Sequence, residues 1–168
     1  MLYLRKPVKD DLGDIRLRYE RSKSFHLPWT HPPKDYDSYL ADSGRRLLCL
    51  EESDEIVGTF NVSGIVRGYF QSAYLAYAAF APYQSKGFMR VGLDLFIKEM
   101  YESLNLHRLE ANIQPGNEAS IKLVSGAGFV KEGFSRNYLN IDNQGWKDHE
   151  RWALLNESWC QKHSQADS

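Results

Sequence analysis

A strand, a loop and a long helix follow one another near the middle of the chain, and this junction constrains the fold most. Residues 72–81, SAYLAYAAFA, are aromatic and small residues without a charge, which is typical of a central strand buried on both faces. Pro82 ends this run. From Met89, apolar residues recur on one face of a helix as far as Leu104. A sheet with helices packed against it is the class of fold that this junction favours.

The rest of the chain shows alternating strand-like and helix-like patterns. Residues 25–33, FHLPWTHPP, contain three prolines and are predicted to form an aromatic loop rather than a regular helix. The other patterns predict strands at residues 2–5, 46–51, 55–66, 107–113, 129–141 and 146–155 and helices at 8–23, at 35–43 and from 118 to either 126 or 128. The chain is expected to form one domain, residues 1–160, with a polar tail at 161–168.

The charge balance argues against several classes of partner. The chain has 21 Lys and Arg residues against 22 Asp and Glu residues, a net charge of −1, so no broad attachment to nucleic acid is expected. No apolar run is long enough to cross a bilayer, and the start lacks a signal-peptide stretch, so we expect a cytoplasmic protein with no membrane partner. None of the five histidines forms a metal-binding pair, and no metal site is predicted.

The loop of the central junction, residues 81–90, reads APYQSKGFMR. The first N–H groups of a helix lack partners within the helix and lie at the positive end of its dipole, which suits a phosphate or pyrophosphate. Gly87 would let the backbone approach such a group closely. Neither the Walker pattern nor Gly-x-Gly-x-x-Gly occurs, which argues against a nucleoside triphosphatase and a Rossmann site. An ordinary strand-to-helix turn is the alternative.

This loop and the order of elements resemble the GNAT superfamily of acetyl-coenzyme A dependent N-acetyltransferases, whose loop reads Gln/Arg-x-x-Gly-x-Gly/Ala. The chain has QSKGFM there, with Met89 in place of the small residue. Five further segments and Tyr138 resemble the RimJ/RimL type of ribosomal-protein N-terminal acetyltransferase: residues 106–112 (LHRLEAN), 117–120 (NEAS), 128–129 (GF), 132–133 (EG) and 145–149 (GWKDH). The resemblance implies an α+β fold with a mixed, mostly antiparallel sheet of about seven strands flanked by helices, splayed between strands four and five.

The resemblance also implies acetyl-CoA as the acetyl donor and direct attack by an amine, without an acyl-enzyme. The loop would bind the pyrophosphate, the end of the buried strand would pair with the pantetheine amides, and a Lys or Arg side chain would meet the outer phosphate. The implied coenzyme contacts are Ala79, Phe80, Gln84, Ser85, Lys86, Gly87, Phe88, Met89, Arg90, Asn117, Ser120 and Lys122.

Two catalytic roles follow from the same resemblance. Ser120 matches the residue that protonates the leaving thiolate, with Tyr83 and Tyr138 as alternatives; Asn117 is equally a good helix N-cap. The base is less defined, because residues 72–81 contain no carboxylate and Asn137 stands where relatives have Asp or Glu. Glu110 is a remaining candidate. A weak base fits an α-amine with a pKa near 8 better than a lysine near 10.4.

The aromatic loop and the last predicted hairpin are expected to line the acceptor site, through His26, Trp29, Asn137, Tyr138, Trp146 and His149. The expected acceptor is the N-terminal amine of a protein. A polyamine or aminoglycoside is an alternative acceptor and would need an acidic groove. A coenzyme-binding module without turnover is an alternative of another class. The sequence leaves both a monomer and a homodimer open.

Overall fold

The computed structural model describes residues 1–160, and the predicted polar tail, residues 161–168, lies outside the described residues. None of the described helices is long and apolar enough to cross a membrane. In chain order the elements are β1 (Leu2–Arg5), η1 (Lys9–Asp11), α1 (Leu12–Arg21), α2 (Lys23–His26), α3 (Tyr36–Ala41), β2 (Arg45–Leu50), β3 (Ile56–Val66), β4 (Ser72–Ala79), α4 (Phe88–Leu104), β5 (Arg108–Ile113), α5 (Glu118–Gly126), β6 (Val130–Asn140), η2 (Ile141–Asn143) and β7 (Trp146–Leu155).

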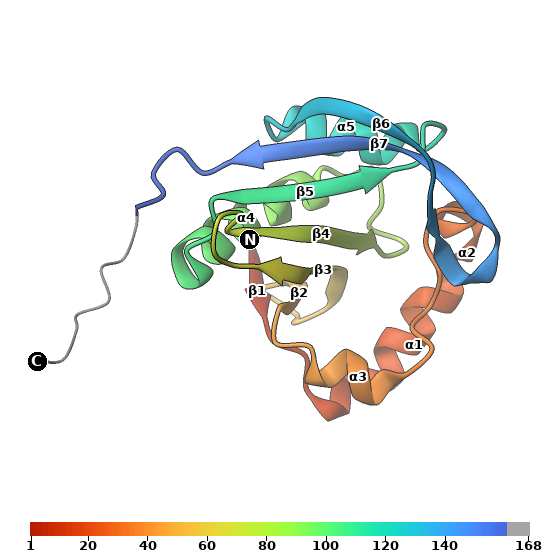
Figure 1. Cartoon of the computed structure of the whole chain (residues 1–168). Coiled ribbons are helices and arrows are strands. Elements are labelled where there is room, and N and C mark those ends of the chain that lie inside the picture. The colour runs from red at the N-terminus through yellow and green to blue at the C-terminus, as the bar shows by residue number, and fades with distance from the viewer. Residues whose placement is uncertain (161–168) are drawn as a thin grey trace, which may run out of the picture.

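The strands form one seven-stranded sheet in the order β1-β2-β3-β4-β5-β7-β6 (Figure 1). Neighbouring strands are antiparallel except for β4 and β5, which are parallel. These two strands pair only from Ser72 opposite Arg108 to Tyr74 opposite Glu110, and they diverge beyond that point. The structure confirms the predicted mixed, mostly antiparallel sheet that is splayed between strands four and five.

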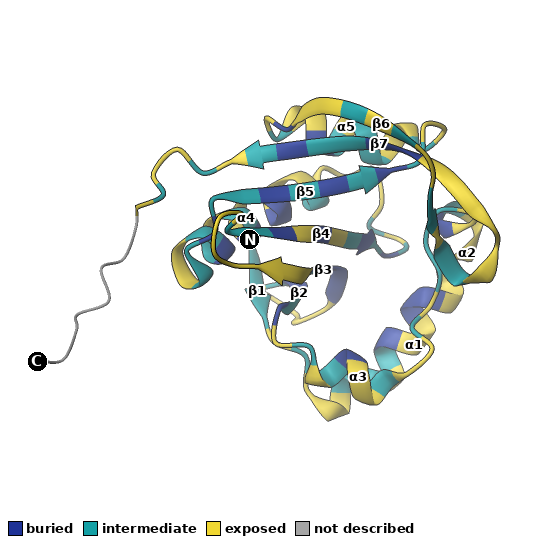
Figure 2. Cartoon of the chain, in the orientation of Figure 1, coloured by how far each residue is buried: buried dark blue, intermediate teal, exposed yellow. Residues whose placement is uncertain are grey.

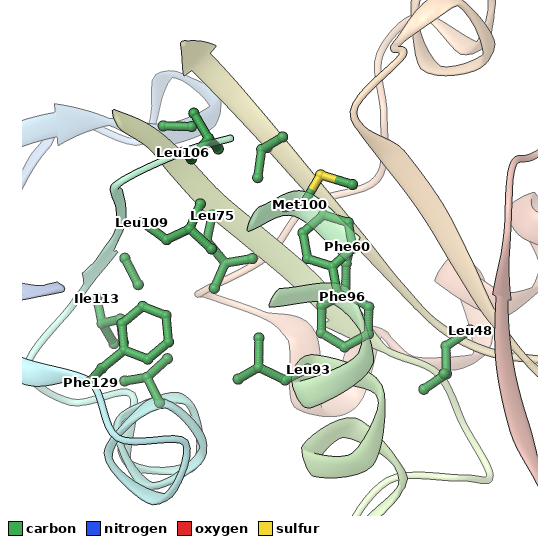
Figure 3. Close-up of a cluster of buried hydrophobic side chains, with 14 of the residues drawn as sticks. Leu48, Phe60, Leu75, Leu93, Phe96, Met100, Leu106, Leu109, Ile113 and Phe129 are labelled. Atoms are coloured by element: carbon green, nitrogen blue, oxygen red, sulfur yellow. The ribbon is translucent and has the colours of Figure 1, made fainter. Parts of the chain in front are cut away.

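Two hydrophobic clusters lie on opposite faces of the sheet, because neighbouring residues of a strand point to opposite faces. Leu48 packs in the cluster beneath α4 and α5, where the rings of Phe60 and Phe96 stack 5.4 Å apart (Figure 3). The preceding residue, Leu47, packs with Tyr19 in the cluster beneath α1 and α3. Figure 2 shows buried segments alternating with less buried ones along β5. Helices therefore cover both faces around the end of β4.

Two expectations from the sequence are corrected. The predicted aromatic loop begins within a helix, because α2 ends at His26; the first proline of that segment is Pro28, so nothing before it breaks the helix. Strand β4 is not buried on both faces along its whole length, since Tyr74 is 39% exposed and Ala76 is exposed. The cluster beneath α1 and α3 reaches β4 at Ala78 and leaves its first half uncovered on that face.

Candidate functional site

A cleft of about 790 Å³ opens at the place where β4 and β5 diverge. Its walls come from the end of β4, the loop before α4, the first turns of α4 and α5, and the aromatic loop. Of the residues predicted from the sequence, the cleft brings together His26, Trp29, Ala79, Gln84, Ser85, Gly87, Phe88, Met89, Arg90, Asn117, Ser120 and Lys122. Segments that lie almost a hundred residues apart in the chain therefore share one site.

The N-terminus of α4 lies at the cleft, and its N-cap residue is Gly87. This glycine has a φ of +80°, a left-handed conformation that side chains rarely adopt, and a Cβ built there would meet no atom within 4 Å. No side-chain hydrogen bond caps this end of the helix. The side chain of Met89 packs inward against Gly58, where its sulfur lies 2.6 Å from the position a Cβ would take. The bulky Met89 therefore leaves the helix end open.

Ser120 and Tyr77 meet inside the cleft. The hydroxyl groups of the two residues form a hydrogen bond between α5 and β4. Burial raises the pKa of Tyr77 to about 12, so its phenol stays protonated at neutral pH. Asn117 is the N-cap of α5 and its side-chain oxygen accepts a hydrogen bond from the Ser120 N–H at 3.4 Å. The capping role expected of Asn117 is confirmed. Tyr77 and Asn117 together hold Ser120 in place.

His26 fixes the aromatic loop to the end of β4. Its Nε2–H donates a 2.6 Å hydrogen bond to the carbonyl oxygen of Ala79, and burial lowers the pKa of His26. The expected coenzyme contact at Phe80 is corrected: its side chain is fully buried, its N–H donates to Val57 and its carbonyl accepts from Tyr83. The part of β4 that β5 leaves unpaired and that lines the cleft is Tyr77–Ala79.

Trp29 lines the cleft and packs against the turn before α5. A Cβ at Gly116 would lie 2.9 Å from the Trp29 ring, so that turn approaches the indole as closely as only a glycine permits. Because Gly116 directly precedes Asn117, the indole is packed next to the N-cap that holds Ser120. The aromatic loop therefore contacts the turn that leads into the helix carrying Ser120.

The expectation that Glu110 acts as the base is corrected. Its carboxylate accepts a 2.8 Å hydrogen bond from Arg108 Nε and lies 3.4 Å from Arg151 Nη2. Arg108 also binds Glu132. Glu110 is absent from the residues that line the cleft. A carboxylate that two guanidinium groups hold outside the cleft has a structural role here.

The predicted acceptor residues of the last hairpin lie away from the cleft lining. His149 is fully buried and its Nδ1–H donates to the carbonyl oxygen of Lys147 at 2.8 Å, so its expected contact with the acceptor is corrected. The Tyr138 ring lies under the guanidinium of Arg151. Asn137 and Trp146 are exposed and remain predictions.

Comparison with known proteins gives the family. A model described as the acetyltransferase (GNAT) domain matches residues 1–130, more than half of the chain. The chain belongs to the GNAT acetyltransferase family. The ribosomal protein uS5-alanine N-acetyltransferase of Escherichia coli K12 is 40% identical over 159 residues, which cover 84% of this chain and 80% of that protein.

Solved structures of GNAT acetyltransferases agree with this fold. The ribosomal-protein-S5-alanine acetyltransferase of Vibrio fischeri superposes with a TM-score of 0.83 and 28% identity, over 95% of this chain and 96% of that one. A spermidine N-acetyltransferase from Vibrio cholerae superposes with a TM-score of 0.77 and 21% identity, over 94% of this chain and 97% of that one. At that lower identity the likeness shows the fold alone.

As a GNAT acetyltransferase the protein uses acetyl-CoA, and the cleft has the groups to bind it. The open N-terminus of α4 at Gly87 offers main-chain N–H groups to a pyrophosphate. Arg90 and Lys122 line the same cleft and supply positive charge, while Lys86 is exposed beside it. The edge of β4 at Tyr77–Ala79 is not paired with β5 and, apart from the Ala79 carbonyl that His26 binds, offers main-chain groups to an amide chain. The donors present thus match the anionic and amide parts of the coenzyme.

Tyr77, the partner of Ser120, is not among the site residues predicted from the sequence. A signal was present, because a tyrosine within a run without charged residues must find a partner for its hydroxyl when it is buried. Glu118, the single carboxylate among the described residues that line the cleft, was not predicted as a site residue either. Glu118 is exposed at the first turn of α5, and the helix N-terminus favours its charge.

Proposed function

We propose that this enzyme acetylates the N-terminal α-amine of a protein, with a ribosomal protein of the uS5 type as the acceptor. The observation that carries this proposal is the 40% identity to a ribosomal protein uS5-alanine N-acetyltransferase over 84% of the chain. The structural likeness to the Vibrio fischeri enzyme of the same name, at 28% identity, supports it. Such an acceptor would place the reaction in the cytoplasm.

The charges on the acceptor side support an α-amine rather than a polyamine. The described residues that line a second hollow, next to the cleft, include Lys147 and no carboxylate. A polyamine carries several positive charges and would need an acidic groove. An α-amine with a pKa near 8 is roughly a tenth neutral at pH 7, whereas a lysine near 10.4 needs about 4–5 kcal/mol to lose its proton. A site without a strong base is therefore sufficient for an α-amine.

Ser120 delivers the proton to the leaving sulfur. When bound, acetyl-CoA supplies the thioester from which the amine nitrogen takes the acetyl group, forming a C–N bond as the C–S bond breaks. The hydroxyls of Tyr77 and Ser120 form a hydrogen bond; with Tyr77 as its donor, the serine's own proton would be free for the sulfur. The proton that the amine nitrogen loses returns to the serine through water. Positioning and a hydroxyl acid thus suffice, without an acyl-enzyme.

The aromatic loop separates the coenzyme cleft from a second hollow of about 510 Å³. Phe25 and Trp29 of this loop line the cleft, whereas Leu27 and His31 line the second hollow. Ile141 and Gln144 of the turn between β6 and β7, Lys147 at the start of β7 and Gln114 also line it. We assign this hollow to the acceptor polypeptide behind its first residue, which would let the amine reach the cleft past Trp29.

Acceptor assays with matched amines test this proposal. The purified protein is incubated with acetyl-CoA and one of three acceptors: an alanine-initiated peptide with a free α-amine, the same peptide with its α-amine blocked and one internal lysine, or spermidine. Mass spectrometry should find one added acetyl group on the α-amine of the first peptide alone. Faster acetylation of spermidine or of the internal lysine would contradict the proposed acceptor, and coenzyme binding without turnover on any amine would contradict the proposed reaction.

A further inference from the structure

The loop that approaches the coenzyme is fastened along its first half only. The N–H of Ala81 donates to the Ser22 hydroxyl at 3.0 Å, and the N–H of Tyr83 donates to the Phe80 carbonyl at 2.8 Å. Within the described part of the chain, no side-chain hydrogen bond holds Gln84, Ser85 or Lys86. Tyr83 is therefore the last side chain that fixes the loop before Gly87.

Tyr83 is tied to the turn between β2 and β3. Its hydroxyl donates a 2.6 Å hydrogen bond to Glu55 Oε2. This bond lowers the pKa of Glu55 and raises the pKa of Tyr83, so a carboxylate faces a protonated phenol. The buried guanidinium of Arg18 lies 3.9 Å from the other carboxylate oxygen and 5.6 Å from the centre of the Tyr83 ring. A phenol held in this way is a poor proton donor to a thiolate, which disfavours Tyr83 as the alternative acid.

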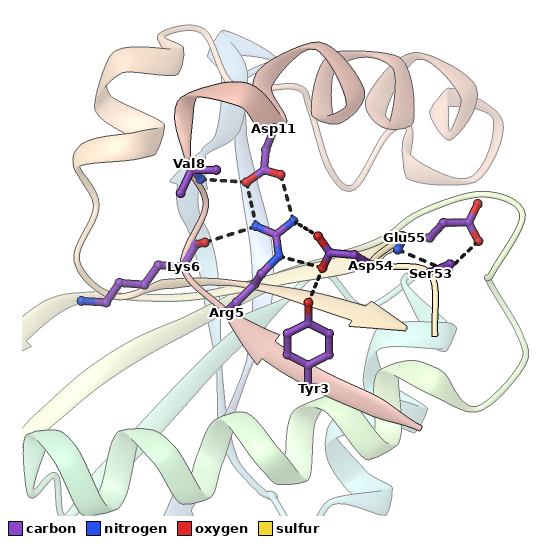
Figure 4. A network of polar contacts seen from close by, with 8 residues as sticks. All are labelled: Tyr3, Arg5, Lys6, Val8, Asp11, Ser53, Asp54 and Glu55. Atoms are coloured by element: carbon purple, nitrogen blue, oxygen red, sulfur yellow. Dashed lines mark hydrogen bonds and ion pairs between the residues drawn. The ribbon is translucent and has the colours of Figure 1, made fainter. Parts of the chain in front are cut away.

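The turn that carries Glu55 is itself held in place. Asp54, the preceding residue, accepts hydrogen bonds from Tyr3 and from Arg5, and Arg5 also pairs with Asp11 at 2.8 Å (Figure 4). Figure 4 shows the carboxylates of Asp54 and Glu55 pointing in different directions from adjacent positions. Asp54 therefore anchors the turn to β1, while the Glu55 side chain remains available to Tyr83.

We propose that Glu55 is a positioning residue for coenzyme A. Through the Tyr83 hydroxyl it holds the loop in the shape that presents the N-terminus of α4 to the pyrophosphate. The Tyr83 ring lies 6.0 Å from the ring of Phe88, the first residue of α4, so a displaced Tyr83 would shift the helix start as well. The inference rests on this loop being the coenzyme site and is independent of which amine is the acceptor.

Two variants and their combination test the role of Glu55. Calorimetry with free coenzyme A, without any acceptor, measures affinity in wild type, Glu55→Ala, Tyr83→Phe and the double variant. Each single variant should raise the Kd for coenzyme A by about three- to tenfold, the size expected for an exposed hydrogen bond to a charged group. The double variant should be no weaker than the weaker single one, because both changes remove the same contact. Tyr83→Phe removes one oxygen atom and keeps the ring, so it tests the idea if Glu55→Ala does not fold.

Three readouts separate positioning from a general loss of structure. Glu55→Gln, whose amide oxygen still accepts from Tyr83, should recover most of the affinity, and Glu52→Ala, which removes an exposed charge from the same turn, should leave it unchanged. Hydrogen exchange of the amides of residues 84–88 should quicken in Glu55→Ala without coenzyme present. In steady state the KM for acetyl-CoA should rise while kcat stays within about twofold. An unchanged Kd in both Glu55→Ala and Tyr83→Phe, or a fall in kcat alone in Tyr83→Phe, would overturn the proposal.

Discussion

The hydroxyl of Tyr77 on β4 forms a hydrogen bond with the hydroxyl of Ser120 on α5, across the cleft that opens where β4 and β5 diverge. The contact joins the strand whose edge is expected to bind the pantetheine with the helix that carries the expected acid. Because the Tyr77 phenol stays protonated, one hydroxyl orients the other. Substituting either member of this pair should therefore slow the reaction.

Ser120→Ala should reduce turnover without releasing the coenzyme. A positioned acid contributes about 100- to 10,000-fold to a rate, so kcat should fall by about 100-fold or more. The Kd for coenzyme A should stay within about twofold, since the methyl group keeps the shape of the helix start. The rate at which free thiol is released from acetyl-CoA measures kcat, and calorimetry measures the Kd for coenzyme A. A turnover equal to wild type would remove Ser120 as the acid.

Tyr77→Phe should give a smaller loss than Ser120→Ala, because the serine proton remains and only its orientation is lost. We expect kcat to fall by about tenfold, the effect of about 1.4 kcal/mol on the barrier. Adding Tyr77→Phe to Ser120→Ala should cause little further loss, because both act on the same proton. Fully additive losses measured in the same thiol-release assay would show that the two residues act separately.

Gly87→Asp should weaken coenzyme binding by at least about tenfold. The substitution forces a side chain into a left-handed conformation, which costs on the order of 1–3 kcal/mol, and adds a negative charge where a pyrophosphate is expected. Gly68→Asp is the matched control, because Gly68 also has a positive φ and open space around it but lies in the turn between β3 and β4. Equal losses of coenzyme affinity in both variants would show that general strain, and not the loop, is responsible.

Trp29→Ala should impair the acceptor more than the coenzyme. The indole packs against Gly116 and lines the cleft, while Pro28 and His31 of the same loop line the proposed acceptor hollow. We expect the KM for an alanine-initiated peptide to rise by about tenfold, the loss of about 1.4 kcal/mol of binding. In Trp29→Phe, which keeps an aromatic ring, the KM for the peptide should lie between those of the wild type and of Trp29→Ala. An unchanged KM for the peptide in a folded Trp29→Ala protein would exclude this role for the loop.

His26 should make stability depend on pH in acid. Burial lowers its pKa in the folded protein below the unfolded value of about 6.5, so the unfolded chain binds the proton first as the pH falls. The contribution of His26 is therefore present above pH 6.5 and is lost below it, with a slope of at most about 1.4 kcal/mol per pH unit. Urea unfolding between pH 7.5 and 5 should show a shallower fall in His26→Gln, whose amide can still donate to Ala79. The same slope in both proteins would contradict this assignment.

Local patterns predicted the parts of the site that depend on neighbouring residues. The uncharged run before Pro82, the helical apolar face after Met89 and the glycine between them are all close in sequence, and the structure has β4, α4 and the open helix end there. The N-cap of α5 at Asn117 was predictable for the same reason.

Contacts between distant segments could not be predicted in this way. Tyr77 and Ser120 lie 43 residues apart, and nothing in either segment indicates that they meet. Glu110 remained a candidate base in the sequence because one of its two arginine partners, Arg151, lies 41 residues further along the chain on β7. His149 looked available for the same reason, since its burial depends on how β6 and β7 pack.

A crystal structure of this protein with coenzyme A bound would test the proposed site. We expect the pyrophosphate against the N–H groups at the start of α4, the pantetheine along the edge of β4 at Tyr77–Ala79, and the sulfur beside the Ser120 hydroxyl. Coenzyme bound elsewhere, or a sulfur placed out of reach of Ser120, would contradict it.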